Sequence, residues 1–133
     1  METVEGTDRE REKDMGGDRM NTRDRIPVCP HGSREDLDFS LVALCDFLNR
    51  MVGTEIIYTS GYRCEQCNKI AGGEENSAHL RGKAVDIVPI NSNQRYIIIE
   101  FSILKRVRRI GIYEDHLHID LDETLPQVVM WVE

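Results

Sequence analysis

The chain contains few aromatic side chains and no long apolar run. Phe, Trp and Tyr together make up 6% of its 133 residues. No apolar stretch approaches the roughly 18 residues that a transmembrane helix needs, so we expect no membrane insertion. The N-terminal stretch METVEGTDREREKDMGG also lacks the apolar segment of a secretory signal, so the sequence predicts neither a membrane span nor a cleaved leader.

Basic residues are also scarce relative to acidic ones. The chain has 17 Lys and Arg against 24 Asp and Glu, a formal net charge of -7. Such a chain is repelled by phosphate backbones and anionic membrane surfaces, so we expect no nucleic acid as its main partner. The length suits one domain with a modest core. The sequence leaves the oligomeric state open, and a monomer is the simplest expectation.

Residues 1–25 carry charge at nearly every second position and almost no large apolar side chain. Such a segment cannot bury enough surface to offset the entropy lost on ordering. We therefore predict a disordered charged tail over residues 1–25 and one folded domain over residues 26–133.

Hydrophobic periodicity in the folded part predicts both helices and short strands. Apolar residues three and four apart predict helices over 34–51 and 92–107, although the Ile-rich run in the second segment could also be a strand. A turn followed by a short helix is expected before Gly72 and Gly73. Ser33 is a candidate N-cap for the first helix, and Gly53 is a candidate stop. Strands are predicted at 54–60, 82–90, 108–113, 116–121 and 126–133. Only Glu114 and Asp115 separate two of them, which predicts a hairpin. The fold class is therefore α+β, with a small, mainly antiparallel sheet flanked by helices.

Asp86 is unexpected because it lies inside an otherwise apolar strand, where an ionised carboxylate is costly without a partner. Strand alternation places His116, His118 and Asp120 together on one face of a later strand. With His79, these side chains offer the imidazole and carboxylate ligands of a zinc site with an open coordination position. An H-x-H pair alone is weak support, so the prediction depends on the order and spacing of the whole set.

Three separated motifs in this chain have the order of a known family. They are S-G-Y-R at 60–63, N-S-x-H-x-x-G-x-A-x-D at 76–86 and D-x-x-H at 115–118. Together they resemble the zinc D-Ala-D-Ala metallopeptidases, which are grouped with lysostaphin-type peptidases and the hedgehog signalling domain. The likeness runs from about Cys29 to Asp120. It implies a zinc peptidase that cuts amide bonds of peptidoglycan stem peptides, as a carboxypeptidase or endopeptidase, with a phage-type lysin as one setting.

The resemblance also implies which residues hold the metal and move the proton. His79, Asp86 and His118 are the expected ligands of one catalytic zinc, a metal that activates water and polarises a carbonyl. Asp115 falls where the family has its catalytic Glu or Asp, although many members have the longer Glu. Neighbouring Glu114 could be the base instead, but it lies one residue away from the position that the family motif gives to this group. Strict alternation would turn Asp115 away from His118, so it reaches the site only if it lies in the turn before the strand.

Three further residues have roles that the resemblance implies and simpler structural alternatives. His116 is expected to stabilise the oxyanion, or else is a solvent-exposed neighbour. Arg63 is expected to bind a substrate carboxylate or carbonyl, or else forms a surface salt bridge. Ser77 is expected to hydrogen-bond the substrate, or else merely caps its loop. Gly82 should allow a close turn between the two ligands that flank it.

The four cysteines are not part of this predicted zinc site. Cys45 lies among leucines at helical spacing, so we expect a buried free thiol. A second, structural zinc at Cys29, His31, Cys64 and Cys67 is one alternative for the others, and a disulfide from Cys29 to Cys64 or Cys67 is another. We do not favour the second zinc, and an intracellular setting argues against a persistent disulfide. The family resemblance implies that these cysteines tether the N-terminal segment to the substrate loop.

Two other functions are compatible with the sequence. One is a non-catalytic, zinc-stabilised binding module with the same fold, although such a module has no reason to retain Asp115. The other is a structural zinc protein built on the cysteines, without hydrolytic activity. We expect synthesis in the cytoplasm and action on the cell wall after release or export. The scissile bond is not determined by these motifs.

Overall fold

The computed structural model describes residues 21–133, so most of the predicted tail lies outside the described residues. The first described helix is α2 (Thr22–Arg25), in the last part of the segment predicted to be a tail. The Asn21 side chain accepts a hydrogen bond from the Asp24 backbone N–H. Thr22 Oγ1 donates to Asp46 Oδ1 at 2.9 Å. Helix α2 is therefore folded structure ahead of the boundary predicted at Ile26.

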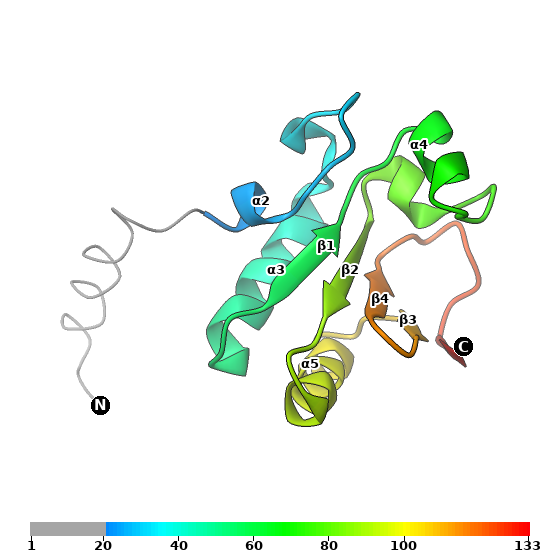
Figure 1. Cartoon of the computed structure of the whole chain (residues 1–133). Helices are drawn as coiled ribbons and strands as arrows, with labels where there is room; N and C mark the ends of the chain where they lie inside the picture. The colour runs from blue at the N-terminus through cyan, green and yellow to red at the C-terminus, as the bar shows by residue number, and fades with distance from the viewer. Residues whose placement is uncertain (1–20) are drawn as a thin grey trace.

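The protein is α+β, as the periodicity predicts, and helices α3 and α5 lie on one side of the sheet (Figure 1). Short helix α4 lies beyond the end of strand β1 (Figure 1). After α2 the elements are η1 (Arg34–Asp36), α3 (Phe39–Val52), β1 (Ile57–Ser60), α4 (Glu65–Ile70), η2 (Ala78–Arg81), β2 (Ala84–Val88), α5 (Ser92–Leu104), β3 (Arg109–Ile112), β4 (Leu117–Asp120) and β5 (Val129–Val132).

The five strands form one sheet in the order β1-β2-β4-β3-β5. Strands β1, β2, β4 and β3 pair in antiparallel fashion, which confirms the mainly antiparallel prediction and the β3–β4 hairpin. The last strand, β5, was predicted as a strand but pairs in parallel with β3. No local pattern predicts that pairing, because it depends on how residues 121–128 cross the end of the hairpin.

Helix α3 begins later than the periodicity over 34–51 predicts, so the assignment of Ser33 as its N-cap is wrong. Ser33 caps only the single turn of η1. Leu37 then has extended backbone angles, and the Asp38 carboxylate accepts two backbone N–H bonds from the first turn of α3. Gly53 ends the helix with a φ of 86°, as predicted. The apolar periodicity continues through η1 because Leu37 packs into the same core.

The core fills the space between the sheet and helices α3 and α5. Its buried members from β2 and β4 are Val85, Ile87, Leu117 and Ile119, which alternate with polar residues along each strand. Cys45 is fully buried among them, and burial raises the pKa of its thiol to about 12, so the expected free thiol is confirmed. Because one face of these strands packs against the helices, the opposite face is free to carry ligands.

In the part of the chain that the structure describes, no helix is long and apolar enough to cross a membrane.

Candidate metal centre and substrate pocket

A single row of residues crosses the sheet on the face opposite the core. Strand pairing places Ser60 beside Asp86, Asp86 beside His118, His118 beside Gly111 and Gly111 beside Trp131. A Cβ atom on Gly111 would lie 2.6 Å from the indole of Trp131. Glycine at this position therefore lets the indole lie across β3 and approach His118, with ring centroids 5.5 Å apart.

His79 reaches the same row from η2, which immediately precedes β2. Ser77 caps η2 by accepting a bond from the His79 backbone N–H at 3.1 Å. Gly82 ends it with a φ of 69°, and any side chain there would collide with the Asp36 carbonyl. The close turn expected at Gly82 is thus present. It brings the His79 side chain, only 2% exposed, over the start of β2.

The three predicted ligands converge on one point. His79 Nε2 lies 3.3 Å from Asp86 Oδ1, and His118 Nδ1 lies 3.2 Å from the same oxygen. The two imidazole rings meet edge to face, with centroids 5.1 Å apart. One donor atom from each of the three side chains lies within 4.8 Å of the others. His79, Asp86 and His118 can therefore share a single cation.

Each of the two rings has an outer nitrogen, which points away from Asp86, and an inner nitrogen, which faces it. The hydrogen bond of the outer nitrogen determines whether the inner one has a free lone pair. His79 Nδ1 lies 2.6 Å from the Gly61 carbonyl oxygen, which can only accept, so Nδ1 carries the proton. His118 Nε2 lies 2.7 Å from Asp120 Oδ2 and donates to it in the same way. In neutral rings, the nitrogens that face Asp86 are then both unprotonated. Three acceptors directed at one point fit zinc, which takes nitrogen and oxygen ligands held by such outer bonds.

In the metal-free site, the ring nitrogen that faces Asp86 can instead carry a proton and donate to the carboxylate. Burial alone would raise the pKa of Asp86, but hydrogen bonds from His118 and His79 outweigh it and hold the pKa below its usual range. Burial lowers the pKa of His118, whereas its bonds to Asp120 and Asp86 raise it more, so the net shift is upward. Protons and a metal ion therefore compete for the same lone pairs.

The metal ligands lie in the wall of a pocket of about 400 Å³. Most of the residues that the sequence singled out line this pocket together: Arg63, Ser77, His79, Asp86, His116 and His118. Arg63 Nε is buried and has no hydrogen-bond partner among residues 21–133. A buried donor without a partner is costly, so this guanidinium is suited to an acceptor on a bound ligand.

Asp115 lies in the turn between β3 and β4, where the sequence required it to be, but its carboxylate does not line the pocket. The side chain is 87% exposed and bonds to His116 Nδ1 at 2.8 Å. That bond to His116 lowers the pKa of Asp115. The His116 ring in turn stacks on Tyr113, with centroids 4.3 Å apart and planes 7° from parallel. In this structure, Asp115 is connected to the pocket through His116.

Four residues of this wall, Arg109, Tyr113, Asp120 and Trp131, make contacts that the sequence did not predict. Asp120 is fully buried between His118 and Arg109, whose Nε lies 2.8 and 3.0 Å from its two carboxylate oxygens. The H-x-D alternation in β4 was a signal for Asp120. Tyr113 and Trp131 gave no such signal, because the hydrogen bond from Trp131 Nε1 to the Tyr113 hydroxyl depends on the placement of β5.

Fold and site together define a small α+β protein in which two histidines and an aspartate, arranged so that they can hold one cation, face an open pocket. Residues 20–122 match the family model described as Peptidase M15, so the chain belongs to this family. Its members are zinc metallopeptidases related to D-Ala-D-Ala carboxypeptidases and the hedgehog domain, which confirms the resemblance carried by the three motifs. A search among curated proteins gave no match.

Proposed function

We propose that this protein hydrolyses amide bonds in the stem peptides or cross-links of peptidoglycan, as a carboxypeptidase or an endopeptidase. The observation that supports this best is the convergence of His79 Nε2, Asp86 Oδ1 and His118 Nδ1 in a pocket that also contains an unpaired arginine nitrogen. Membership of the Peptidase M15 family supports peptide cleavage, and the peptidoglycan substrate rests on the family analogy.

The three ligands are held in place by the chain itself. Gly61 and Asp120 accept from the outer nitrogens of His79 and His118, which leaves the inner nitrogens ready for a metal. When bound there, zinc would supply the Lewis acidity that polarises the scissile carbonyl and activates water. The Arg109 guanidinium forms an ion pair with buried Asp120 and balances its charge. Asp86 is then the carboxylate whose charge a bound metal ion would balance.

Proton transfer falls to the pair formed by Asp115 and His116. By analogy with the family, we assign Asp115 as the group that accepts the proton from the attacking water and later returns it to the leaving amine, a role for which its exposed carboxylate must turn from His116 into the pocket. Its 2.8 Å bond to His116 Nδ1 and the Tyr113 stack orient the imidazole toward the pocket. His116 is then placed to donate to the oxyanion of the tetrahedral intermediate.

Arg63 and Ser77 bind the substrate in this proposal. The unpaired, buried Nε of Arg63 and the planar guanidinium suit a peptide carboxylate or carbonyl. Ser77 lines the same wall, and its hydroxyl oxygen already accepts from the His79 backbone. Its O–H remains available as a donor to a substrate carbonyl.

The exposed Asp115 carboxylate favours one competing function, a zinc-stabilised binding module that does not cleave peptides. Such a module would retain the three ligands, but nothing in its function would require Asp115. The two proposals therefore differ in what an isosteric change at Asp115 should do.

The test is digestion of purified peptidoglycan and of synthetic stem peptides, with released fragments identified by mass spectrometry. We expect release by the wild type, loss with a chelator, and loss in His118→Ala and Asp115→Asn. Glu114→Gln is the matched control, because it removes the neighbouring carboxylate and should keep activity. Zinc binding without release from any substrate would refute the peptidase and leave the binding module.

A further inference from the structure

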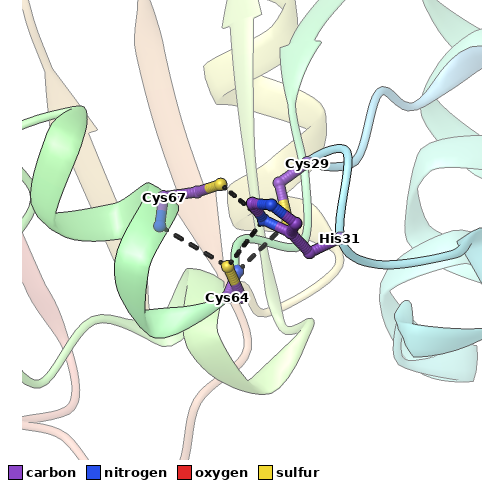
Figure 2. A group of neighbouring side chains, drawn as sticks. All are labelled: Cys29, His31, Cys64 and Cys67. Carbon is purple, nitrogen blue, oxygen red and sulfur yellow. Dashed lines mark hydrogen bonds between the residues drawn. The ribbon is translucent and has the colours of Figure 1, made fainter.

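A second group of ligand-type side chains lies outside the pocket, where α4 meets the segment that leads into η1. Cys29 and His31 belong to that segment, whereas Cys64 is the N-cap of α4 and Cys67 lies in its first turn. Figure 2 shows the four side chains turned toward one another from these two parts of the chain. One ligand atom from each lies within 4.8 Å of the others.

We propose that Cys29, His31, Cys64 and Cys67 bind a second zinc ion, which is structural and holds α4 against the N-terminal segment. Three thiolates and one imidazole form a closed tetrahedral ligand set, without an open position for a substrate. Soft sulfur ligands in this geometry select zinc over magnesium or calcium. The sequence alone left this site beside a disulfide from Cys29 to Cys64 or Cys67 as an alternative, and did not favour it.

The distances between the ligand atoms support a shared metal. His31 Nδ1 lies 3.5 Å from Cys64 Sγ and 3.4 Å from Cys67 Sγ. Bonds of about 2.3 Å to sulfur and about 2.1 Å to nitrogen in a tetrahedron place those atoms about 3.6 Å apart. One imidazole nitrogen has either one lone pair or one proton, so one well-directed hydrogen bond, S–H···N or N–H···S, would explain only one of the two short distances. A metal explains both.

Backbone N–H groups donate to two of the sulfurs. The Cys64 N–H donates to Cys29 Sγ at 3.3 Å, and the Cys67 N–H donates to Cys64 Sγ at 3.5 Å. Backbone N–H groups directed at sulfur in this way are compatible with a sulfur that also ligates a metal. They also fix the direction of each sulfur, as outer bonds do for the ligands of a metal site.

Helix α4 has little else to hold it. It has six residues, and its only buried residue is the polar Asn68. Ile70, its one large aliphatic residue, is 78% exposed. A helix this short is unstable without tertiary contacts. Beside it, the N-terminal segment is joined to the link after β1 by the backbone bond from the Cys29 N–H to the Tyr62 carbonyl, at 3.1 Å.

The second zinc would act on the pocket indirectly, by positioning its wall. Arg63 immediately precedes Cys64, and residues 71–74, which follow α4, line the pocket. The four proposed zinc ligands are themselves not among the residues that line the pocket. Loss of this zinc should therefore raise KM for a peptide substrate more than it lowers kcat, because Arg63 belongs to substrate binding in our proposal.

The experiment measures zinc per chain in the full-length protein, together with the absorption of the cobalt-substituted form. Thiolate ligands give sulfur-to-cobalt charge-transfer bands, and the His79–Asp86–His118 site cannot. We expect two zinc ions and these bands in the wild type. Cys64→Ser should retain one zinc and lose the bands, and His118→Ala should retain one zinc and keep them. The outcome is thus independent of whether any peptide is cleaved.

Cys64→Ser retains an oxygen at the N-cap of α4, so the helix keeps its cap. Three further variants serve as controls. His31 is exposed, so His31→Ala should weaken the second site without disturbing the core, and His31→Cys should restore it as a four-cysteine site. Cys45→Ala, which removes the buried thiol in α3, should keep both zinc ions.

Two results would overturn the proposal. The first is a single zinc in the wild type that disappears in His118→Ala, with no sulfur-to-cobalt bands. The second is a disulfide among Cys29, Cys64 and Cys67 in freshly purified protein, detected by mass spectrometry after alkylation of free thiols.

Discussion

Replacing Asp120 with asparagine tests how the metal centre is prepared. Asp120 is fully buried, accepts from His118 Nε2 at 2.7 Å and forms an ion pair with Arg109. Asparagine has nearly the same shape but no charge, and its amide can present a donor to His118. The imidazole then no longer has a fixed proton on Nε2, and the lone pair on Nδ1 is less available to zinc.

The expected loss of zinc affinity can be judged from residues that, like Asp120, hydrogen-bond to a metal-binding histidine. Their removal typically weakens metal binding by about 10–100-fold, which is roughly 1.4–2.8 kcal/mol. The upper part of this range is expected here, because Asp120 is buried and also balances Arg109, whose side chain is only 13% exposed. Competition with a chromophoric chelator measures the zinc affinity. A Cys64→Ser background restricts the titration to the His79–Asp86–His118 site.

Asp122 provides the matched control for this measurement. It is also a fully buried aspartate, two residues beyond the end of β4, and its carboxylate bonds to Thr124 and Arg81. Its backbone N–H donates to Asp120, a bond that Asp122→Asn retains. Asp122→Asn should lower the thermal stability of the metal-free protein and leave zinc affinity unchanged. Equal zinc affinity in Asp120→Asn and the wild type would refute the reasoning, as would an equal loss in both variants.

Other positions give independent predictions. Gly82→Ala should destabilise the protein by about 2 kcal/mol or more in chemical denaturation, because φ is 69° and a Cβ atom would collide with the Asp36 carbonyl. Unchanged stability would show that η2 can shift. Asp38→Ala should cost about 1 kcal/mol at neutral pH through loss of the α3 cap and of the Lys83 bond. Burial alone would raise the pKa of Asp38, but the Lys83 and backbone bonds lower it. Its stabilisation is therefore present above the unfolded pKa and is lost as pH falls through the lower folded pKa, so the two proteins should converge in acid unfolding. Arg63→Lys should lower kcat/KM on a cleaved stem peptide by roughly 10–100-fold through loss of the guanidinium fork, whereas an unchanged kcat/KM would exclude Arg63 from substrate binding.

Much of the fold could be predicted because its signals are local. The apolar spacing in 92–107, the two-residue link at Glu114 and Asp115, and the stop at Gly53 depend on residues within one or two turns of each other. The start of α3 was misplaced because Leu37 continues the apolar period while its backbone is extended. Periodicity reports which side chains are buried, and capping by Asp38 decides where the helix begins.

The metal ligands were predictable for a different reason. Buried carboxylates are costly, so Asp86 in an apolar strand already required a partner, and the three motifs of the family named His79 and His118. Strand alternation predicted that His118 and Asp120 share a face. Each of these inferences uses only residue types and short spacings.

The sequence by itself predicted the fold class, the family and His79, Asp86 and His118 as candidate metal ligands, because these depend on local periodicity and on motifs within single segments. Only the tertiary structure decided that Asp86, His118, Gly111 and Trp131 form one row, since register and strand order are set by long-range pairing. It also brought Cys29 and His31 to Cys64 and Cys67. A metal site depends on ligand atoms a few ångströms apart, and separation along the chain does not report that distance.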